Sequence, residues 1–307
     1  MITTRLKIAL AACVALAGAT LAAPALAQDI VIKHKQGELA LPKTPEKVLV
    51  FDMASLDTLD ALGVEIAGVP GGKKPEYLKA YEGDNYAKVG TLFEPDYEAV
   101  NAAAPDLIIV GGRSAAKYAE LAAIAPTIDL STDTANFLGS AEENVLKLGD
   151  IFGKKTEANA LIARLKSSAG NLKEKAPAAG KGLLILTTGG KMSAYGPGSR
   201  FGALHDDYGV TAAATDLKTG NHGQAITFEF ILETDPDWLF VIDRDAAIGR
   251  EGAAAAQFLD NEIVRQTKAW KNNHVVYLDG ASWYLIGGGI QAMQKTVDQL
   301  TAALIKN

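Results

Sequence analysis

Five polar residues of the sequence stand directly after apolar runs or within glycine-rich loops. Arg113 follows a pair of glycines, Arg200 lies in a turn-rich segment, and Arg244 closely follows an apolar run. His222 lies between two glycines, and Tyr284 stands shortly before a run of three glycines. Loops of this kind commonly carry function because a rigid scaffold positions them. We therefore predict that these five residues contact a ligand.

The three arginines predict a ligand with several negative charges and many oxygen acceptors. A guanidinium group is planar, donates several hydrogen bonds and stays charged. His222 and Tyr284 add two possible ligands for a transition metal, and phenolate oxygen suits Fe(III), with imidazole as a borderline partner. A bound metal lowers the pKa of a group that coordinates it, so a tyrosine can bind as phenolate at neutral pH.

No motif of the sequence indicates a site for a bare metal ion. His-x-His, Cys-x-x-Cys and His-Glu-x-x-His are all missing from the sequence. We therefore expect iron to arrive within an organic chelate, and we expect no intrinsic cofactor. The ordinary alternatives are a surface histidine, a tyrosine that packs beside Trp283, and an arginine paired with Asp243 or Asp245. The placement of the whole set after strands and in loops favours ligand binding.

A repeated segment links two of the arginines. Residues 98–113 and 229–244 align at a constant offset of 131, with a Glu, a Pro-Asp pair, an apolar run and a closing Arg in each copy. Each copy predicts a helix, a turn and a strand that ends just before an arginine. Ligands of open α/β sheets bind outside the carboxyl ends of the strands. Unless the similarity is chance, two equivalent lobes present Arg113 and Arg244 to one cleft.

The pattern of the whole chain predicts an α/β fold with two lobes. Short apolar runs alternate with helical patterns, which is typical of parallel strands in βα units. We expect each lobe to hold a mainly parallel sheet flanked by helices, a single long rigid helix to join the lobes, and the ligand cleft to lie between them. The predicted strands are 48–52, 66–69, 107–110, 183–186, 239–242 and 275–278. The predicted parts are an N-terminal lobe at 28–139, a connecting helix at 140–176 with an interruption at Gly153, and a C-terminal lobe at 177–307.

The first residues predict export to the periplasm. Arg5 and Lys7 precede a small, apolar run at 8–21, and an Ala-Leu-Ala cleavage site ends at Ala27. This pattern is typical of a secretory signal peptide at 1–27. A lipoprotein signal at Cys13 is the alternative, but only three apolar residues separate Lys7 from its lipobox. We therefore do not expect a lipid anchor.

Composition and motifs exclude several classes of function. The net charge of −6 argues against a general nucleic-acid binder, which needs a basic surface. The one cysteine lies in the signal peptide, so the mature chain has no thiol or disulfide chemistry. A Gly-x-Ser-x-Gly elbow and a P-loop are both missing. We therefore predict a binding protein and not an enzyme.

From about Ile30 to Lys306 the sequence resembles the siderophore-binding proteins of ABC importers, the class III or cluster A substrate-binding proteins. Within this family it is most similar to the branch that binds ferric catecholates of the enterobactin type. The resemblance implies that Arg113, Arg200 and Arg244 form a positive triad around catecholate oxygens. It also implies that His222 and Tyr284 complete the coordination of Fe(III) when the chelate is only tetradentate. The stretches that carry the resemblance are 43–62, 104–113, 193–206, 221–233, 236–244 and 277–285.

The resemblance also implies the partners. The protein would capture ferric tris- or bis-catecholate siderophores as a monomer and deliver them to an inner-membrane permease with its ATPase. Another iron chelate (hydroxamate or citrate), haem or a cobamide is the first alternative, and a periplasmic hydrolase is a second from another class. Acidic residues of each lobe would dock on the permease, and the candidates are Glu76, Glu82, Glu229, Glu233 and Asp237.

Overall fold

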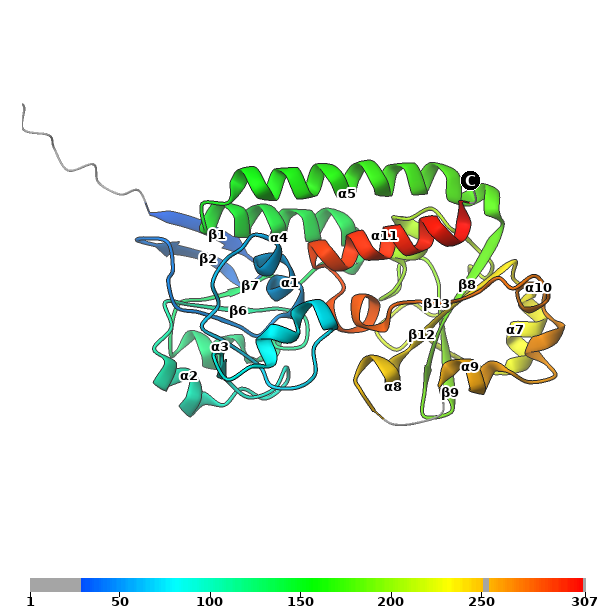
Figure 1. The fold of residues 1–307 in the computed structure, drawn as a ribbon, viewed down its shortest axis with the longest axis horizontal. Helices are drawn as coiled ribbons and strands as arrows, with labels where there is room; N and C mark the ends of the chain where they lie inside the picture. Colours follow the sequence, from blue (N-terminus) through cyan, green and yellow to red (C-terminus); the bar gives the residue numbers. More distant parts are fainter. Residues whose placement is uncertain (1–28, 251–253, 306–307) are drawn as a thin grey trace, which may run out of the picture.

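Two α/β lobes lie side by side beneath one long helix in the computed structural model of the chain (Figure 1). The structure describes residues 29–250 and 254–305. The predicted signal peptide and its cleavage site therefore lie outside the described residues. None of the helices within these ranges is long and apolar enough to cross a membrane.

The N-terminal lobe is built on a five-stranded parallel sheet in the order β5-β4-β3-β6-β7. Its central strands are fully buried runs of Val, Leu and Ile, as expected of a parallel sheet that is covered on both faces. A β1-β2 hairpin precedes the sheet. The elements are β1 (Ile30–His34), β2 (Gly37–Leu41), β3 (Val48–Val50), α1 (Met53–Ala61), β4 (Gly68–Val69), a 3-10 helix (Glu76–Glu82), β5 (Ala87–Lys88), α2 (Tyr97–Ala103), β6 (Leu107–Val110), 3-10 helix (Ala115–Lys117), α3 (Tyr118–Ala122), β7 (Thr127–Asp129) and 3-10 helix (Thr134–Asn136).

The C-terminal lobe has a mixed sheet in the order β11-β9-β8-β12-β13, with β10 beside the start of β8. Strands β8, β10, β12 and β13 are parallel, whereas β9 and β11 run antiparallel to their neighbours. The elements are a 3-10 helix (Ala176–Ala179), β8 (Lys181–Thr188), β9 (Lys191–Tyr195), α6 (Ala203–Asp206), β10 (Thr211–Ala212), β11 (Gln224–Ile226), α7 (Phe228–Thr234), β12 (Trp238–Asp243), α8 (Arg244–Ala247), α9 (Ala255–Leu259), 3-10 helix (Val264–Gln266), α10 (Lys268–Lys271), β13 (Val275–Tyr277), a π-helix (Ala281–Ile286) and α11 (Ile290–Leu304).

The repeated segment has the same structure in both lobes. Helices α2 and α7 each end at a left-handed residue, Ala104 with φ 46° and Asp235 with φ 41°, and a buried central strand follows each. In each copy the aspartate after the proline caps the start of the neighbouring strand. Asp106 accepts hydrogen bonds from the backbone N–H of residues 46 and 47, and Asp237 accepts one from Lys181. The two copies are therefore structurally equivalent units.

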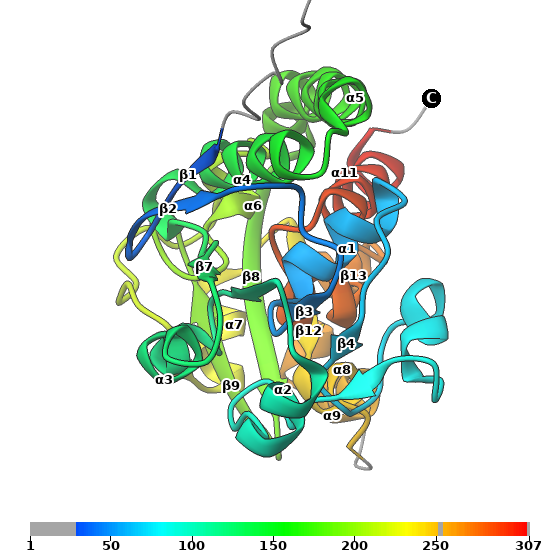
Figure 2. The same ribbon diagram turned by 90° about the vertical axis from the view of Figure 1, so that its left-hand side faces the viewer.

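The region between the lobes contains two helices, α4 (Phe137–Ile151) and α5 (Lys155–Lys175), where the sequence predicts one connecting helix with an interruption at Gly153. The chain turns between them at Gly153, whose φ of +65° suits glycine and ends the first helix. The end-on view shows α4, α5 and α11 as a layer above the sheets (Figure 2). Only α5 runs over both lobes, and at about 1.5 Å per residue it is roughly 30 Å long. We therefore propose α5 alone, rather than all of 140–176, as the connecting helix.

A second tie between the lobes lies at the start of α11. This helix has no side-chain cap of its own, because Gly289 precedes it. Asp57 of α1 supplies the cap from the other lobe, since its carboxylate accepts hydrogen bonds from the N–H of Gln291 at 2.8 Å and of Ala292 at 3.2 Å. Tyr77 Oη donates to the same carboxylate at 2.6 Å. A Cβ at position 289 would lie 2.5 Å from Asp57, so glycine permits this contact.

This buried contact predicts a specific pH dependence of stability. Burial raises the pKa of Asp57 to about 6, although its hydrogen bonds partly oppose the shift. The folded protein therefore keeps a proton that the unfolded chain releases near pH 4, as an ordinary aspartate does. The resulting stabilisation, up to about 3 kcal/mol, is fully present below about pH 4 and is lost as the pH rises through 6.

The change Asp57→Asn removes this proton uptake. We expect the free energy of unfolding of the wild type, relative to D57N, to decrease between pH 4 and pH 7 in urea unfolding experiments. The exposed Asp84→Asn serves as the matched control and should leave the slope unchanged. Parallel pH profiles for the wild type and D57N would show that Asp57 is ionised normally in the folded protein.

Candidate ligand-binding site

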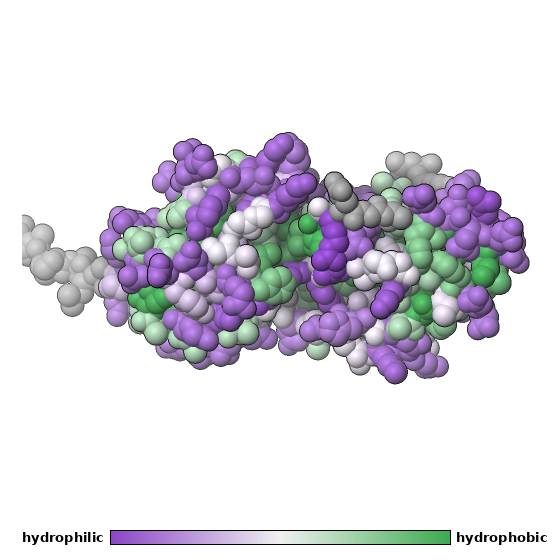
Figure 3. Space-filling model, turned by 90° about the horizontal axis from the view of Figure 1, so that it is seen from below, coloured by the Kyte–Doolittle hydropathy of each residue, from purple (hydrophilic) through white to green (hydrophobic). Residues whose placement is uncertain are grey.

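A cavity of about 580 Å³ lies between the lobes, and all five predicted residues line it. Arg113 comes from the loop after β6, and Arg244 begins α8 directly after β12. Arg200 and His222 lie in loops of the C-terminal lobe, and Tyr284 lies in the π-helix. In the view from below, hydrophobic and strongly hydrophilic residues adjoin around a hollow in the middle of the molecule (Figure 3). The structure thus brings the predicted set into one space.

Tyr284 lies at the centre of the arginine triad. The guanidinium carbons of Arg113, Arg200 and Arg244 lie 5.1, 4.6 and 5.4 Å from the centre of its ring. These distances are typical of cation–π contacts. Arg200 also lies 4.7 Å from the ring of Phe201. The aromatic rings therefore hold three like charges close together.

Hydrogen bonds fix the same arrangement. Arg113 reaches across from the N-terminal lobe and donates to the carbonyl oxygens of Tyr284 at 2.5 Å and of Leu285 at 3.1 Å. Arg200 donates to the Tyr284 carbonyl at 3.3 Å. Arg244 Nε donates to the Tyr284 hydroxyl oxygen at 2.8 Å. The π-helix backbone and the phenol thus orient all three guanidinium groups.

The electrostatics of the cavity favour an anion. Burial would raise the pKa of Tyr284, but the hydrogen bond from Arg244 and the charges of all three arginines outweigh it, and the pKa is lowered. The pKa of Arg113 is also lowered, first by burial and then by the nearby charge of Arg200. Asp52 lies close to Arg113, but burial raises the pKa of its carboxyl. Among the described residues, Arg244 alone of the three arginines forms an ion pair, with Asp245 at 3.7 Å, so the triad carries more positive than negative charge.

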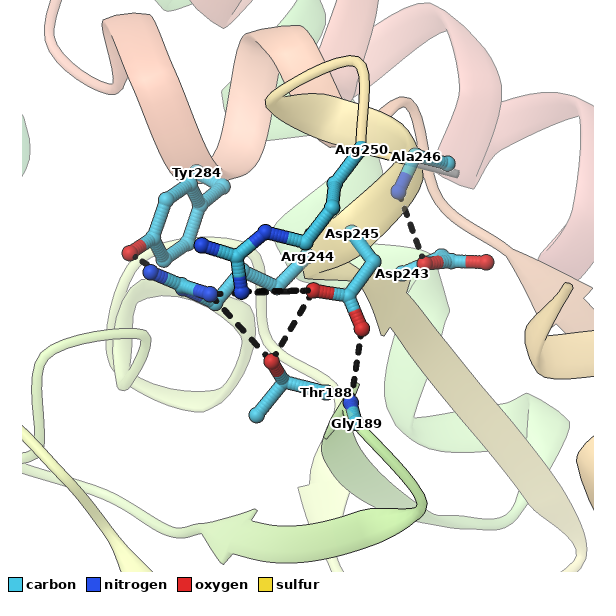
Figure 4. A network of polar contacts seen from close by, with 8 residues as sticks. All are labelled: Thr188, Gly189, Asp243, Arg244, Asp245, Ala246, Arg250 and Tyr284. Carbon is cyan, nitrogen blue, oxygen red and sulfur yellow. Dashed lines mark hydrogen bonds and ion pairs between the residues drawn. The ribbon is translucent and has the colours of Figure 1, made fainter. Parts of the chain in front are cut away.

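The acidic neighbours of Arg244 have further partners, and its guanidinium group also contacts Thr188, Asp245 and Tyr284. Asp243 caps two helix starts by accepting from the N–H of Ala246 and Ala255. Asp245 accepts hydrogen bonds from Thr188 Oγ1 and Gly189 N–H and lies 3.7 Å from Arg244 (Figure 4). This network anchors one side of the guanidinium group while Nε points to Tyr284. Arg244 therefore pairs with Asp245, as the ordinary alternative expects, but it also donates to Tyr284 at the cavity.

His222 lies at the cavity as an exposed side chain in the loop before β11. The structure thus places it on the same cavity as Tyr284, and its role as an iron ligand stays a prediction. Within residues 29–250 and 254–305, His, Cys, Asp and Glu form no group of three that could hold a metal ion.

Sequence reasoning missed most of the N-terminal wall of the cavity. This wall adds apolar side chains that follow short strands, lie in loops or begin a helix: Phe51, Met53, Leu92, Phe93, Leu130 and Phe137. The loop of Leu92 and Phe93 follows β5, a strand of two exposed residues that has no apolar pattern. Without that strand, nothing in the sequence placed this loop at the carboxyl edge of the sheet. The backbone carbonyls that accept hydrogen bonds from Arg113 could not be predicted either, because every residue has a carbonyl group.

Comparison with known proteins defines the class. A family model described as "Periplasmic binding protein" matches residues 48–281, so the chain belongs to this family of binding proteins. Membership makes it a substrate-binding protein that acts outside the cytoplasm.

Relatives with assigned ligands cover nearly the whole chain. The petrobactin-binding protein YclQ of Bacillus subtilis is 42% identical over 284 residues, which cover 91% of this chain and 89% of YclQ. The ferric-anguibactin-binding protein FatB of Vibrio anguillarum is 33% identical over 281 residues, covering 90% and 87%. The crystal structure of YclQ matches with a TM-score of 0.87 at 41% identity, covering 91% of this chain and all of that one. The periplasmic catecholate-siderophore binding protein VctP from Vibrio cholerae matches with a TM-score of 0.85 at 31% identity, covering 90% and 100%. The predicted fold class and the resemblance to siderophore-binding proteins are confirmed.

Proposed function

We propose that this protein captures ferric catecholate siderophores in the periplasm and delivers them to an ABC importer for iron uptake. The observation that carries the proposal is the triad of Arg113, Arg200 and Arg244 around Tyr284 in the cavity between the lobes. The names of the relatives support the ligand class, since YclQ, FatB and VctP bind petrobactin, ferric anguibactin and a catecholate siderophore.

The charges of triad and ligand match. A ferric tris-catecholate carries about three negative charges, because each catecholate contributes two and iron offsets three. Three guanidinium groups in a partly desolvated cavity balance that charge, and each donates charge-assisted hydrogen bonds to catecholate oxygens. Ferric hydroxamates and cobamides carry less negative charge and would leave the triad uncompensated.

For a tetradentate bis-catecholate we propose that His222 and Tyr284 occupy the two remaining positions of the iron. The arginines already lower the pKa of Tyr284, so less work is needed to form the phenolate that binds Fe(III). His222 lines the same cavity from an exposed loop. A small movement of that loop toward the ligand would complete the coordination.

The proposal also covers how the protein is exported and which partner it meets. The sequence of residues 1–27 supports export by a signal peptide cleaved after Ala27, without a lipid anchor. The mature protein would act as a monomer that docks on a permease. Candidate docking residues are Glu76 or Glu82 in the N-terminal lobe and Glu229, Glu233 or Asp237 in the C-terminal lobe.

A titration tests the ligand class. Mature protein is titrated with ferric bis- and tris-catecholates, ferric hydroxamates, ferric citrate and haem, and tryptophan fluorescence is followed. Trp283 lines the cavity beside Tyr284, so a coloured chelate should quench its emission. We expect ferric catecholates to bind at least about tenfold more tightly than the other chelates, a difference of roughly 1.4 kcal/mol. Equal or weaker binding of the catecholates would refute the proposal.

A further inference from the structure

The two walls of the cavity differ in their number of arginines and in how exposed their apolar side chains are. The C-terminal lobe contributes Arg200 and Arg244 together with buried aromatic residues such as Phe201 and Trp283, whereas the N-terminal lobe contributes one arginine and a row of apolar side chains. Most of these apolar residues are at least partly buried in the lobe and can offer only an edge to a ligand. Phe93 differs, because 59% of its surface is exposed. It is the one exposed large hydrophobic residue of the described chain that also lines the cavity.

A rigid turn holds Phe93 in this position. Thr91 Oγ1 accepts hydrogen bonds from the N–H of Phe93 at 3.2 Å and of Glu94 at 3.0 Å. Thr91 N–H donates to the Glu94 carbonyl at 2.8 Å, and Lys117 pairs with the Glu94 carboxylate at 3.0 Å. Gly90 has a φ of +103°, and a Cβ there would lie 2.4 Å from the Glu94 carbonyl oxygen. Hydrogen bonds and an ion pair therefore hold the backbone of the turn on both sides of Phe93, and its side chain stays exposed.

We infer that Phe93 is a specificity-determining residue whose ring stacks on an aryl arm of the bound chelate. This inference rests on the proposed function, because it specifies a ligand with aromatic rings. The charged iron centre lies against the arginines and Tyr284, and the ring of Phe93 covers an arm that extends toward the N-terminal lobe. Exposing a large ring to water is unfavourable, and stacking removes one face of each of the two rings from water. Because hydrogen bonds already order the backbone of the turn, little backbone freedom is lost on binding.

The N-terminal wall adds a selection for apolar surface that charge alone does not provide. An arginine triad selects for negative charge and oxygen acceptors, and citrate chelates offer both. An apolar ring at the opposite wall gains contact only from a ligand that also has an apolar face. The pair of walls therefore selects amphipathic, aryl-containing chelates over small hydrophilic ones of similar charge.

Calorimetric titration of the mature protein with a ferric tris-catecholate tests the inference. We expect Phe93→Ala to weaken binding about tenfold, as loss of a stacked ring and its buried area predicts. Phe93→Tyr and Phe93→Trp keep a ring face and should bind within about twofold of the wild type. The matched control is Tyr97→Ala, which removes an exposed aromatic of the same lobe that does not line the cavity.

The outcomes separate this inference from the proposed function. Wild-type protein that fails to bind the ferric catecholate would refute both. Wild-type binding together with unchanged binding by F93A, or equal losses in F93A and Y97A, would overturn the role of Phe93 alone. F93A that binds the chelate normally but fails to support iron uptake in cells would place Phe93 at the permease instead, which also contradicts the inference. Phe93→Ser provides a second truncation that tests the same contact.

Discussion

Replacing Arg113 by glutamine is expected to weaken the binding of a ferric tris-catecholate by about 1–3 kcal/mol, roughly 5- to 150-fold. Arg113 is the triad member that crosses from one lobe to the other, through its bonds to the carbonyls of Tyr284 and Leu285. The change therefore removes a charge that faces the ligand and a contact that orients the π-helix. Arg200→Gln and Arg244→Gln should each fall in the same range.

The measurement is the dissociation constant at low and high salt, by calorimetry or fluorescence. Arg164→Gln is the matched control, because Arg164 is exposed on α5 and does not line the cavity. It makes the same change in net charge at a distance, where salt screens it. If R113Q and R164Q weaken binding equally, the triad contributes only through the net charge of the protein.

Replacing Tyr284 by phenylalanine is expected to weaken binding of a tetradentate ferric bis-catecholate at least about tenfold, because even residues that only support a metal ligand cost 10–100-fold in metal affinity. The absorption spectrum of the complex should also change, since the phenolate leaves the iron. A tris-catecholate fills all six positions itself, so its affinity should change far less. His222→Ala should show the same contrast between the two chelates.

The affinity for the bis-catecholate should also depend on pH in a defined direction. Binding of the bis-catecholate through phenolate releases the Tyr284 proton, so affinity rises with pH until the tyrosine is ionised in the free protein. Arg244→Gln removes the hydrogen bond and the charge that lower the pKa of Tyr284. The rise in affinity should therefore move to higher pH in R244Q and disappear in Y284F. Tyr277→Phe, a change outside the cavity, is the control. An unchanged spectrum in Y284F and H222A would rule out direct coordination.

The residues of the site could be predicted from the sequence where a polar side chain directly follows a recognisable strand. Arg113 and Arg244 follow the two central strands, and the repeat at a spacing of 131 residues places them in equivalent positions. The six apolar runs all contain strands, because a buried parallel strand needs a run of apolar residues. The antiparallel hairpin of β8 and β9 was missed, although Gly189 and Gly190 both adopt positive φ in its turn.

Features that depend on contacts between distant segments could not be predicted. Asp57 caps a helix that begins more than 230 residues later, and no local pattern marks an aspartate in α1 as the partner of α11. The division into α4 and α5 followed from Gly153, but which helix spans the lobes depends on how the two pack. Phe93 lies in a turn held by Thr91, and its exposure toward the cavity is a property of the folded chain.

The most direct test of the proposed site is a crystal structure of the mature protein with a ferric bis-catecholate. We expect the iron to lie in the cavity between the lobes, bonded to the Tyr284 phenolate oxygen and a nitrogen of His222. The guanidinium groups of Arg113, Arg200 and Arg244 should donate to catecholate oxygens, and Phe93 should cover an aryl arm. A chelate bound outside this cavity, or bound within it without contact to the three arginines, would contradict the proposed function.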